Sequence, residues 1–229
     1  DLGIIFDTDV DRAGAVLSDG TELNRNRIIA MMAAILLREH PGTTIVTDSI
    51  TSTGLAAFIR KHGGVHHRFK RGYRNVTNES MRLNREGHDS QLAMETSGHG
   101  ALKENYFLDD GAYLVTRLLI ELARAKKEGY TLESLIADLA EPAESREFRM
   151  NILVPDFKAY GQKIIDELNV YAASQPGWSV APDNFEGVRV NLDKAHGDGW
   201  FLLRLSLHDP VIPLNIESDS VGGVRQITQ

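Results

Sequence analysis

The stretch Asp7-Thr8-Asp9-Val10-Asp11-Arg12 places three carboxylates within five residues. It lies between two short apolar runs, 2–6 and 13–17, which are typical of strands. Side chains two apart on a strand stand roughly 6.6 Å apart, whereas Mg²⁺ takes oxygen ligands at about 2.0–2.1 Å. The backbone must therefore curl, and this brings together like charges whose repulsion a divalent cation relieves. The sequence predicts a tight acidic turn that holds a cation, with a solvated turn as the plainer alternative.

Three kinds of site use aspartates at this spacing. An EF-hand loop needs Gly at its sixth position and Glu at its twelfth, where this chain has Arg12 and Ser18. A phosphatase of the haloacid-dehalogenase type would use Asp7 as nucleophile and Asp9 as acid/base, but such enzymes carry Thr or Val in place of Asp11. The third kind is a metal loop of sequence Asp-x-Asp-x-Asp-Arg, which the stretch matches at every specified position.

Composition excludes several classes of function. A chain of 229 residues with 42% apolar and 25% charged residues is ordinary for one or two globular domains. The net charge of −7 argues against a general nucleic-acid binder. No apolar run approaches the ~20 residues needed to cross a membrane. The absence of cysteine excludes disulfides, thiolate metal sites and cysteine nucleophiles, and it fits a cytoplasmic location.

Strands alternate with helices as far as residue 127. Asn24 can cap a first helix, whose apolar residues recur at helical spacing until Pro41. The pattern predicts further helices from 53 to the glycines at 63–64, over 76–85 and over 110–127, and strands over 43–47, 65–69 and 91–94. This alternation indicates an α/β layered domain with a largely parallel, mixed sheet.

The pattern changes after Gly129. A short helix over 131–139 precedes Pro142, and the rest reads as a strand (147–154), a helix (156–173) and three strand-like runs (188–192, 200–207 and 211–216). We expect a smaller α+β domain here. The last segment, 219–229, is expected to begin a helix that has little to pack against.

Three loops carry further chemistry. Residues 95–99 end a strand and offer a carboxylate, hydroxyls and an imidazole, which suit a polyhydroxylated ligand. Residues 70–74 hold three cations and a glycine, which could receive a phosphate or a sugar hydroxyl. Arg204 and Ser206 at a strand end make a site of phosphate size. Each of the first two loops also has a simpler, non-functional interpretation. Residues 95–99 could be a capped turn, and residues 70–74 a solvated basic loop.

In this order the motifs resemble those of the α-D-phosphohexomutase superfamily, the phosphoglucomutases and phosphomannomutases. The superfamily follows its metal loop with a Gly-Glu-x-Ser-Gly-His sugar loop, a Lys-Glu pair and an Asp-Asp-Gly, and then with a phosphate loop that begins Arg-x-Ser and ends in Pro. This chain matches at 95–99, 103–104, 109–111 and at Arg204, Ser206 and Pro210. It departs at Met94, Leu207 and His208, which stand where Gly, Gly or Asn, and Thr are usual.

The resemblance assigns roles residue by residue. It implies Mg²⁺ as cofactor, held by Asp7, Asp9 and Asp11. It implies catalytic roles for Arg12 and His99. It implies substrate binding by Lys70, Arg71, Gly72, Tyr73, Glu95, Ser97, Lys103, Arg204, Ser206 and His208.

The resemblance also implies a fold and an activity. The expected domains are the end of a metal-binding domain (1–20), an α/β sugar-binding domain (21–140) and an α+β phosphate-binding domain (141–229). The expected reaction moves a phosphoryl group reversibly between positions of a hexose phosphate, glucose or mannose 1- or 6-phosphate, through an enzyme phosphoserine and a bisphosphate intermediate. A homo-oligomer is compatible with all of this.

The superfamily's phosphoserine loop has no counterpart in this sequence. We therefore expect the chain to be part of a longer protein, and to fold but be inactive as a mutase alone. Two alternatives stay open: a dehalogenase-type phosphatase that uses Asp7, and a non-catalytic sugar-phosphate binding module.

Overall fold

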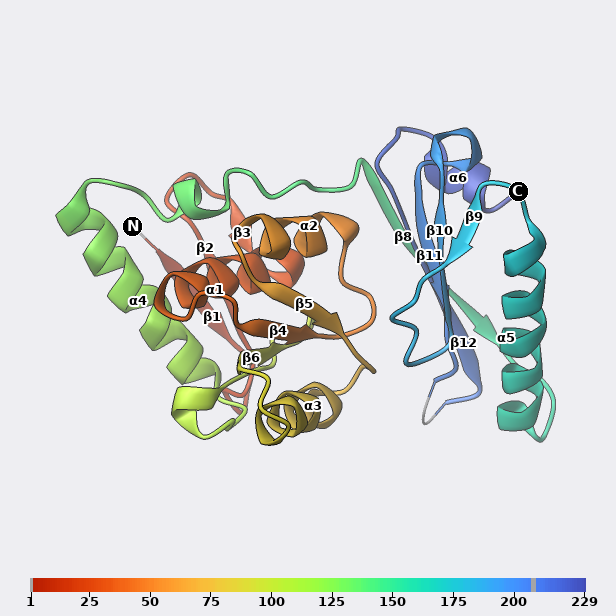
Figure 1. The fold of residues 1–229 in the computed structure, drawn as a ribbon, viewed down its shortest axis with the longest axis horizontal. Coiled ribbons are helices and arrows are strands. Elements are labelled where there is room, and N and C mark those ends of the chain that lie inside the picture. The colour runs from red at the N-terminus through yellow and green to blue at the C-terminus, as the bar shows by residue number, and fades with distance from the viewer. Residues whose placement is uncertain (1, 207–208) are drawn as a thin grey trace. The chain divides into compact units, whose positions relative to one another are not determined.

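The structure is a computed structural model that describes residues 2–206 and 209–229 (Figure 1). The chain divides into two compact units, Asp1–Ala140 and Glu141–Gln229. Each unit has a hydrophobic core of its own. Whether residues 1–20 end a separate domain in a longer protein stays a prediction.

The described residues form helices and strands as follows. The helices are α1 (Arg25–Glu39), α2 (Thr53–Lys61), α3 (Tyr73–Arg85), α4 (Gly111–Glu128), α5 (Phe157–Ser174) and α6 (Gly223–Ile227), with short 3₁₀ turns η1 (Lys103–Asn105), η2 (Glu133–Ile136) and η3 (Lys194–His196). The strands are β1 (Gly3–Phe6), β2 (Ala13–Val16), β3 (Glu22–Leu23), β4 (Thr44–Thr47), β5 (Val65–Arg68), β6 (Ser90–Met94), β7 (Gly100–Leu102), β8 (Glu144–Asn151), β9 (Trp178–Val180), β10 (Val188–Leu192), β11 (Gly199–Leu203) and β12 (Val211–Ser218).

The first unit begins with an antiparallel sheet of order β1-β2-β3. Phe6 pairs with Ala13, so the acidic turn (Asp7–Arg12) is the connection of the β1–β2 hairpin. The two ends of the turn are therefore held close together, because the strands that flank it are hydrogen-bonded to each other.

A second sheet, of order β5-β4-β6-β7, forms the centre of the first unit. Strands β5, β4 and β6 are parallel, and the short β7 turns back antiparallel to β6. Ile45 belongs to the core cluster that also contains residues of α1, α2 and α4, while its neighbour Val46 belongs to a second cluster, with Val76 and Leu83 of α3. Successive strand residues thus face opposite helix layers, which confirms the predicted α/β layered domain with a mixed, largely parallel sheet.

Helix α1 is buried around most of its circumference. Ten consecutive residues, 28–37, are buried, because α1 packs against both sheets and against α2 and α4. Asn24 is at the N-cap position, as expected, but its side chain donates to Glu22 Oε2 (2.9 Å) and does not cap the helix.

The second unit packs α5 on one face of an antiparallel sheet of order β8-β12-β11-β10-β9, as Figure 1 shows. Val190 and Phe201 are cross-strand partners, and both face the core beneath α5. On the other face the Arg189 guanidinium lies 3.5 Å from the Trp200 ring centre, and the Trp200 indole N–H donates to Glu217 (3.0 Å). This is the expected smaller α+β fold.

Several predicted boundaries were wrong. Strand β8 begins three residues before the predicted one and ends at Asn151, because its ladder with β12 covers 144–151. The predicted helix over 131–139 is only the 3₁₀ turn η2. Helix α6 does find a core: Val224 is buried in it, and Glu144 accepts from the backbone N–H of Gly222 and Val224.

Candidate functional site

The acidic turn is held closed by its own arginine. Asp7 Oδ2 lies 2.6 Å from Arg12 Nε, and Asp7 Oδ1 accepts the backbone N–H of Arg12 at 3.2 Å. Val10 adopts a left-handed backbone conformation (φ 63°), which a β-branched residue rarely does. The turn is thus curled, as the spacing of the aspartates predicts.

Two other segments bond to the backbone of the turn. The N–H of Gly111, the first residue of α4, donates to Val10 C=O at 3.1 Å. A Cβ at position 111 would lie 2.8 Å from that oxygen, so only glycine allows this approach. Arg12 forms an isolated antiparallel bridge with His99. The turn is therefore bonded to residues about 90 and 100 positions further along the chain.

The loop 95–99 follows β6, at the carboxyl end of the parallel strands. Gly98 N–H donates to Glu95 C=O (3.0 Å), and Gly98 has φ 101°, where other residues are strained. Glu95 is buried, and its Oε1 accepts the N–H of Gly72 at 2.6 Å. Ser97 Oγ lies 3.5 Å from Glu95 Oε2. The structure thus joins the loop 95–99 to the loop 70–74.

The side chains of the loop 70–74 have different surroundings: two contact other residues of the site and two are exposed. Tyr73 stacks on the His99 ring, with centroids 5.2 Å apart and planes at 24°. Arg71 Nε lies 3.6 Å from the buried carboxylate of Asp48. Lys70 and Arg74 are exposed.

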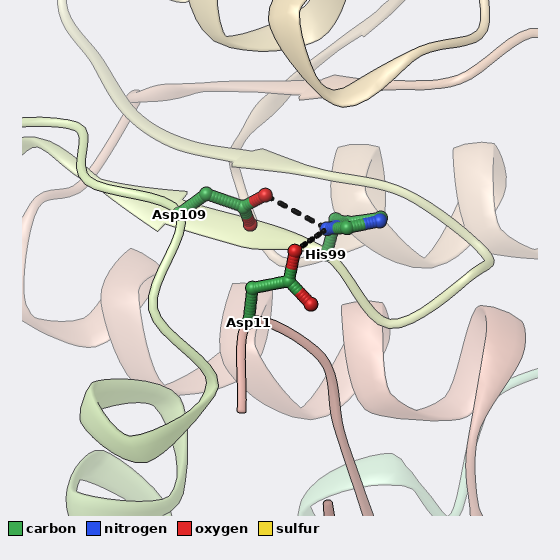
Figure 2. A group of neighbouring side chains, drawn as sticks. All are labelled: Asp11, His99 and Asp109. Atoms are coloured by element: carbon green, nitrogen blue, oxygen red, sulfur yellow. Dashed lines mark hydrogen bonds and ion pairs between the residues drawn. The ribbon is translucent and has the colours of Figure 1, made fainter. Parts of the chain in front are cut away.

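His99 contacts two aspartates from different parts of the chain (Figure 2). Its Nδ1 lies 2.7 Å from Asp109 Oδ2 and 3.7 Å from Asp11 Oδ2. The second oxygen of Asp109 accepts the N–H of Gly100 at 3.1 Å.

Charge and burial shift the pKa values of three acidic residues of the site. Burial would raise the pKa of Asp7, but the hydrogen bonds and charge of Arg12 outweigh it and lower that pKa. Burial, aided by the charge of Asp48, raises the pKa of Glu95. Burial also raises the pKa of Asp109, against the opposing effect of His99.

A cavity of about 270 Å³ adjoins the acidic turn. It is lined by Ile5, Phe6, Asp7, Arg12, Ala13, Gly14, Asn24, Arg25, Thr96, Ser97 and Gly98. The cavity therefore lies against both the turn and the loop 95–99.

The donor set of the turn fits a hard cation. Ligand atoms of Asp7, Asp9 and Asp11 lie within 4.8 Å of one another, and carboxylate oxygens are the donors that Mg²⁺ prefers. Asp11 Oδ1 is buried and accepts no hydrogen bond from the part of the chain that the structure describes. Such an oxygen is costly to bury unless it binds something. A second group, of Asp11, His99 and Asp109, shares Asp11.

The expected phosphate loop lies in the second unit. Arg204 directly follows β11 and is buried, and its N–H donates to Pro213 C=O (3.1 Å). Ser206 N–H donates to Val211 C=O, and Ser206 Oγ accepts the N–H of Asp209 at 3.3 Å. His208 lies outside the described residues.

Most of the predicted site residues of the first unit lie in the acidic turn or in the loops 70–74 and 95–99, which contact one another. Lys103 lies elsewhere. Lys103 Nζ pairs with Asp89 Oδ1 (2.9 Å), next to the start of β6, whereas Glu95 follows the end of that strand. The superfamily resemblance assigned no role to Asp109, which touches His99, or to Asp48, which accepts from Thr96 Oγ1 (2.8 Å). The Asp-Asp-Gly motif was the one signal for Asp109.

No helix among the described residues is long and apolar enough to span a bilayer.

Known proteins resemble the chain over nearly its whole length. A Pseudomonas putida phosphomannomutase/phosphoglucomutase is 32% identical over 229 residues, which are 99% of this chain and 45% of that protein. A Burkholderia thailandensis phosphoglucomutase/phosphomannomutase family structure superposes with a TM-score of 0.78 at 30% identity, over 100% of this chain and 44% of that one. The chain thus spans less than half the length of the curated relatives it matches.

A more distant structure shows the same fold. The Aspergillus fumigatus N-acetylphosphoglucosamine mutase, solved with GlcNAc-6P and magnesium, has a TM-score of 0.64 at 15% identity, over 99% of this chain and 47% of that one. Residues 24–142 match the family model described as phosphoglucomutase/phosphomannomutase, alpha/beta/alpha domain III. That match covers more than half of the chain, and the chain therefore belongs to the phosphoglucomutase/phosphomannomutase family.

Proposed function

We propose that this chain is the metal-, sugar- and phosphate-binding part of a phosphohexomutase, an isomerase that moves a phosphoryl group between positions of a hexose phosphate. The observation that carries the proposal is the bridge between Arg12 and His99, which sets the acidic turn against the end of the loop 95–99. A cation site and a set of hydroxyl-binding groups thereby share one side of one compact unit.

In this proposal the acidic turn holds Mg²⁺ through Asp7, Asp9 and Asp11. The A. fumigatus relative, solved with magnesium, supports this choice of ion. When bound, the ion would neutralise charge on the phosphoryl group in transit. Arg12 adds a guanidinium beside the ligands, and it also fixes Asp7 in place.

The loop 95–99 would bind the sugar. Glu95 and Ser97 are suited to hydrogen bonds with sugar hydroxyls, because one is a buried acid and the other a hydroxyl close beside it. Gly72 and Arg71 come from the neighbouring loop, with Lys70 exposed at its start. Lys103 is left out of this set, since it lies at the other end of β6.

The second unit would bind the phosphate that does not react. Arg204 is the cation, and Ser206 offers a hydroxyl on the loop that follows. A protonated His208 could add a second cation in place of the superfamily's threonine. This set also comes from the resemblance.

His99 would act as the base of the transfer. A sugar oxygen would form the new bond to phosphorus while the bond from phosphorus to the serine oxygen breaks. The proton of the sugar hydroxyl would pass to His99, and the departing serine oxygen would take a proton from solvent. In the reverse direction His99 would return the proton. The serine is expected from the family resemblance alone.

The rival phosphatase reading gains no support. The chain belongs to the phosphoglucomutase/phosphomannomutase family, and its 32% identical relative from Pseudomonas putida is a mutase by name.

Calorimetry on the purified chain tests the binding part of the proposal. Mg²⁺ binding is expected to weaken by about tenfold or more in Asp9→Asn, because a ligand of a hard cation is lost. The matched control is Asp19→Asn, which removes an exposed aspartate from the β2–β3 connection.

Glucose 1-phosphate should bind the wild-type chain in the presence of Mg²⁺ and bind more weakly to Glu95→Gln. A chain that binds neither glucose nor mannose 1-phosphate, with or without Mg²⁺, would contradict the proposal. The activity itself is measured by coupling glucose 6-phosphate production to its dehydrogenase, in a whole protein that contains this chain.

A further inference from the structure

The imidazole of His99 is fixed at one edge and on one face. Nδ1 lies 2.7 Å from Asp109 Oδ2, and the ring of Tyr73 stacks on the imidazole. Figure 2 shows the other ring nitrogen, Nε2, pointing away from both aspartates. We propose that Asp109 is a positioning residue that keeps the proton of neutral His99 on Nδ1, so that Nε2 is the nitrogen that takes the proton of the substrate hydroxyl. This inference rests on the proposed function.

The chemistry of the pair fixes the tautomer. An ionised carboxylate can only accept hydrogen bonds, so the nitrogen that faces Asp109 must carry the hydrogen. A neutral imidazole has one N–H, and Nε2 is then unprotonated and basic. When Nε2 takes a proton, the carboxylate of Asp109 stabilises the imidazolium that forms.

Asp109 has both carboxylate oxygens engaged, and this sets its orientation. Oδ2 faces His99 and Oδ1 accepts the N–H of Gly100 at 3.1 Å. The backbone of Asp109 also forms an isolated bridge with Ala101 on β7. The carboxylate is therefore held by the same short hairpin that carries His99.

The segment before Asp109 is strained. Tyr106 and Phe107 have φ of 56° and 58°, a left-handed conformation unusual for two successive aromatic residues. Phe107 N–H donates to Leu102 C=O at 2.9 Å, and the turn leads directly to Asp109 and to Asp110, which caps α4 through the N–H of Tyr113. Strain of this kind persists where the surrounding contacts require one placement, here that of Asp109 beside His99.

Asp11 is the rival acceptor, and its distance rules it out for this hydrogen bond. Asp11 Oδ2 lies 3.7 Å from Nδ1, beyond hydrogen-bonding range, whereas Asp109 is at 2.7 Å. Asp11 also belongs to the acidic turn, where the proposed function gives it a cation to hold. The two aspartates beside His99 thus have separate roles.

Nitrogen NMR of the purified, ¹⁵N-histidine-labelled chain tests the tautomer directly, because protonated and unprotonated ring nitrogens resonate far apart. At a pH where His99 is neutral, the wild type should show the proton on Nδ1. A wild type with the proton on Nε2 would overturn the proposal without any variant.

Asp109→Asn should reverse the tautomer. The N–H of Gly100 needs an acceptor, so the amide oxygen of the asparagine should take the place of Oδ1 and its NH₂ should face His99. An NH₂ donor forces Nδ1 to accept, which leaves the proton on Nε2. Asp11→Asn should leave the tautomer unchanged; a reversal in Asp11→Asn but not in Asp109→Asn would overturn the proposal.

A matched control comes from the second unit. His196 Nδ1 lies 2.6 Å from Asp193 Oδ1, an exposed pair with the same chemistry. Asp193→Asn should change the signal of His196 alone and leave His99 and the activity as they are.

Kinetics in a whole protein that contains the chain separate positioning from a structural effect. Asp109→Asn should lower kcat by about 100- to 10,000-fold with little change in KM, as expected for a base in the wrong tautomer. The double variant His99→Ala/Asp109→Asn should be no slower than His99→Ala, because Asp109 acts through His99. Additive losses would overturn the proposal. An Nδ1-protonated wild type in a chain that binds no hexose phosphate would instead overturn the proposed function.

Discussion

Glu95 illustrates how one buried carboxylate can be prepared for a polar ligand. It follows a strand, it is buried, and Gly72 N–H donates to one of its oxygens while Ser97 Oγ lies close to the other. Its pKa is raised by burial and by Asp48. An acid in this state gains more than an exposed one from a hydroxyl that donates to it, because water does not compete fully.

Glu79 provides a pH test at the residue scale. It is buried, and the hydrogen bonds of Arg82 lower its pKa, with a smaller contribution from His67. A carboxylate with a lowered pKa adds stability above its unfolded pKa, and that stability is lost as the pH falls through the folded value. Glu79→Gln should therefore be less stable than the wild type at pH 7, and the difference in the free energy of unfolding should narrow between about pH 5 and pH 3.

Urea unfolding at several pH values measures this difference. Glu128→Gln, at the exposed end of α4, is the control and should differ little from the wild type at any pH. A Glu79→Gln difference that stays constant down to pH 3 would show that the ion pair does not account for it.

At the scale of elements, the first residue of helix α4 is hydrogen-bonded to the backbone of the acidic turn. Gly111 opens α4 and donates to Val10 C=O, and a Cβ there would lie 2.8 Å from that oxygen. Gly111→Ala should push the turn away and weaken Mg²⁺ binding by about tenfold, since cation ligands tolerate little displacement. Calorimetric Mg²⁺ titration measures the change.

Gly14→Ala is the matched control for this prediction. Position 14 is on β2, two residues beyond the turn, and the nearest atom to an added Cβ is Leu23 O at an ordinary 3.8 Å. Its Mg²⁺ affinity should stay within about twofold of the wild type. Equal losses in both variants would mean that the contact at position 111 has no special part in holding the turn.

Helix caps show where local sequence suffices and where it does not. Asn24 has the residue type of a cap and the right position, yet its amide bonds to Glu22. Ser52, which the sequence analysis did not single out, accepts the N–H of Leu55 at 2.9 Å and caps α2. Both side chains have the chemistry for capping, so the choice is made by the neighbours that each one meets.

At the scale of the whole molecule, two units with separate cores follow one another. Ile45 belongs to the core of the first unit and Phe201 to the core of the second. Ile45→Ala should cost about 2–5 kcal/mol and Phe201→Ala about 3–5 kcal/mol, each in its own unit alone.

Calorimetric unfolding of the chain distinguishes the two effects. Each substitution should lower the temperature of one transition and leave the other in place. A single transition that both substitutions shift equally would show that the units unfold together. The isolated segment 141–229 provides a second measurement, since it should retain a folded spectrum.

Sequence by itself determined the order of the longer helices and strands, the acidic turn, and the three loops that are proposed to bind ligand. These follow from the spacing of apolar residues and from side-chain chemistry, which act over a few neighbouring positions. The α/β and α+β fold class could be predicted for the same reason, whereas short elements such as β7 and β9 could not, because three residues carry no periodic signal.

Tertiary structure alone decided which of those residues meet. It placed Asp109 rather than Asp11 within hydrogen-bonding distance of His99, stacked Tyr73 on that ring, and paired Lys103 with Asp89 at the far end of β6. Contacts between positions ten to ninety residues apart depend on strand register, on the direction in which β7 returns and on a left-handed turn at 106–107. Those features arise when the chain packs, because no local pattern fixes the distance between side chains on different elements.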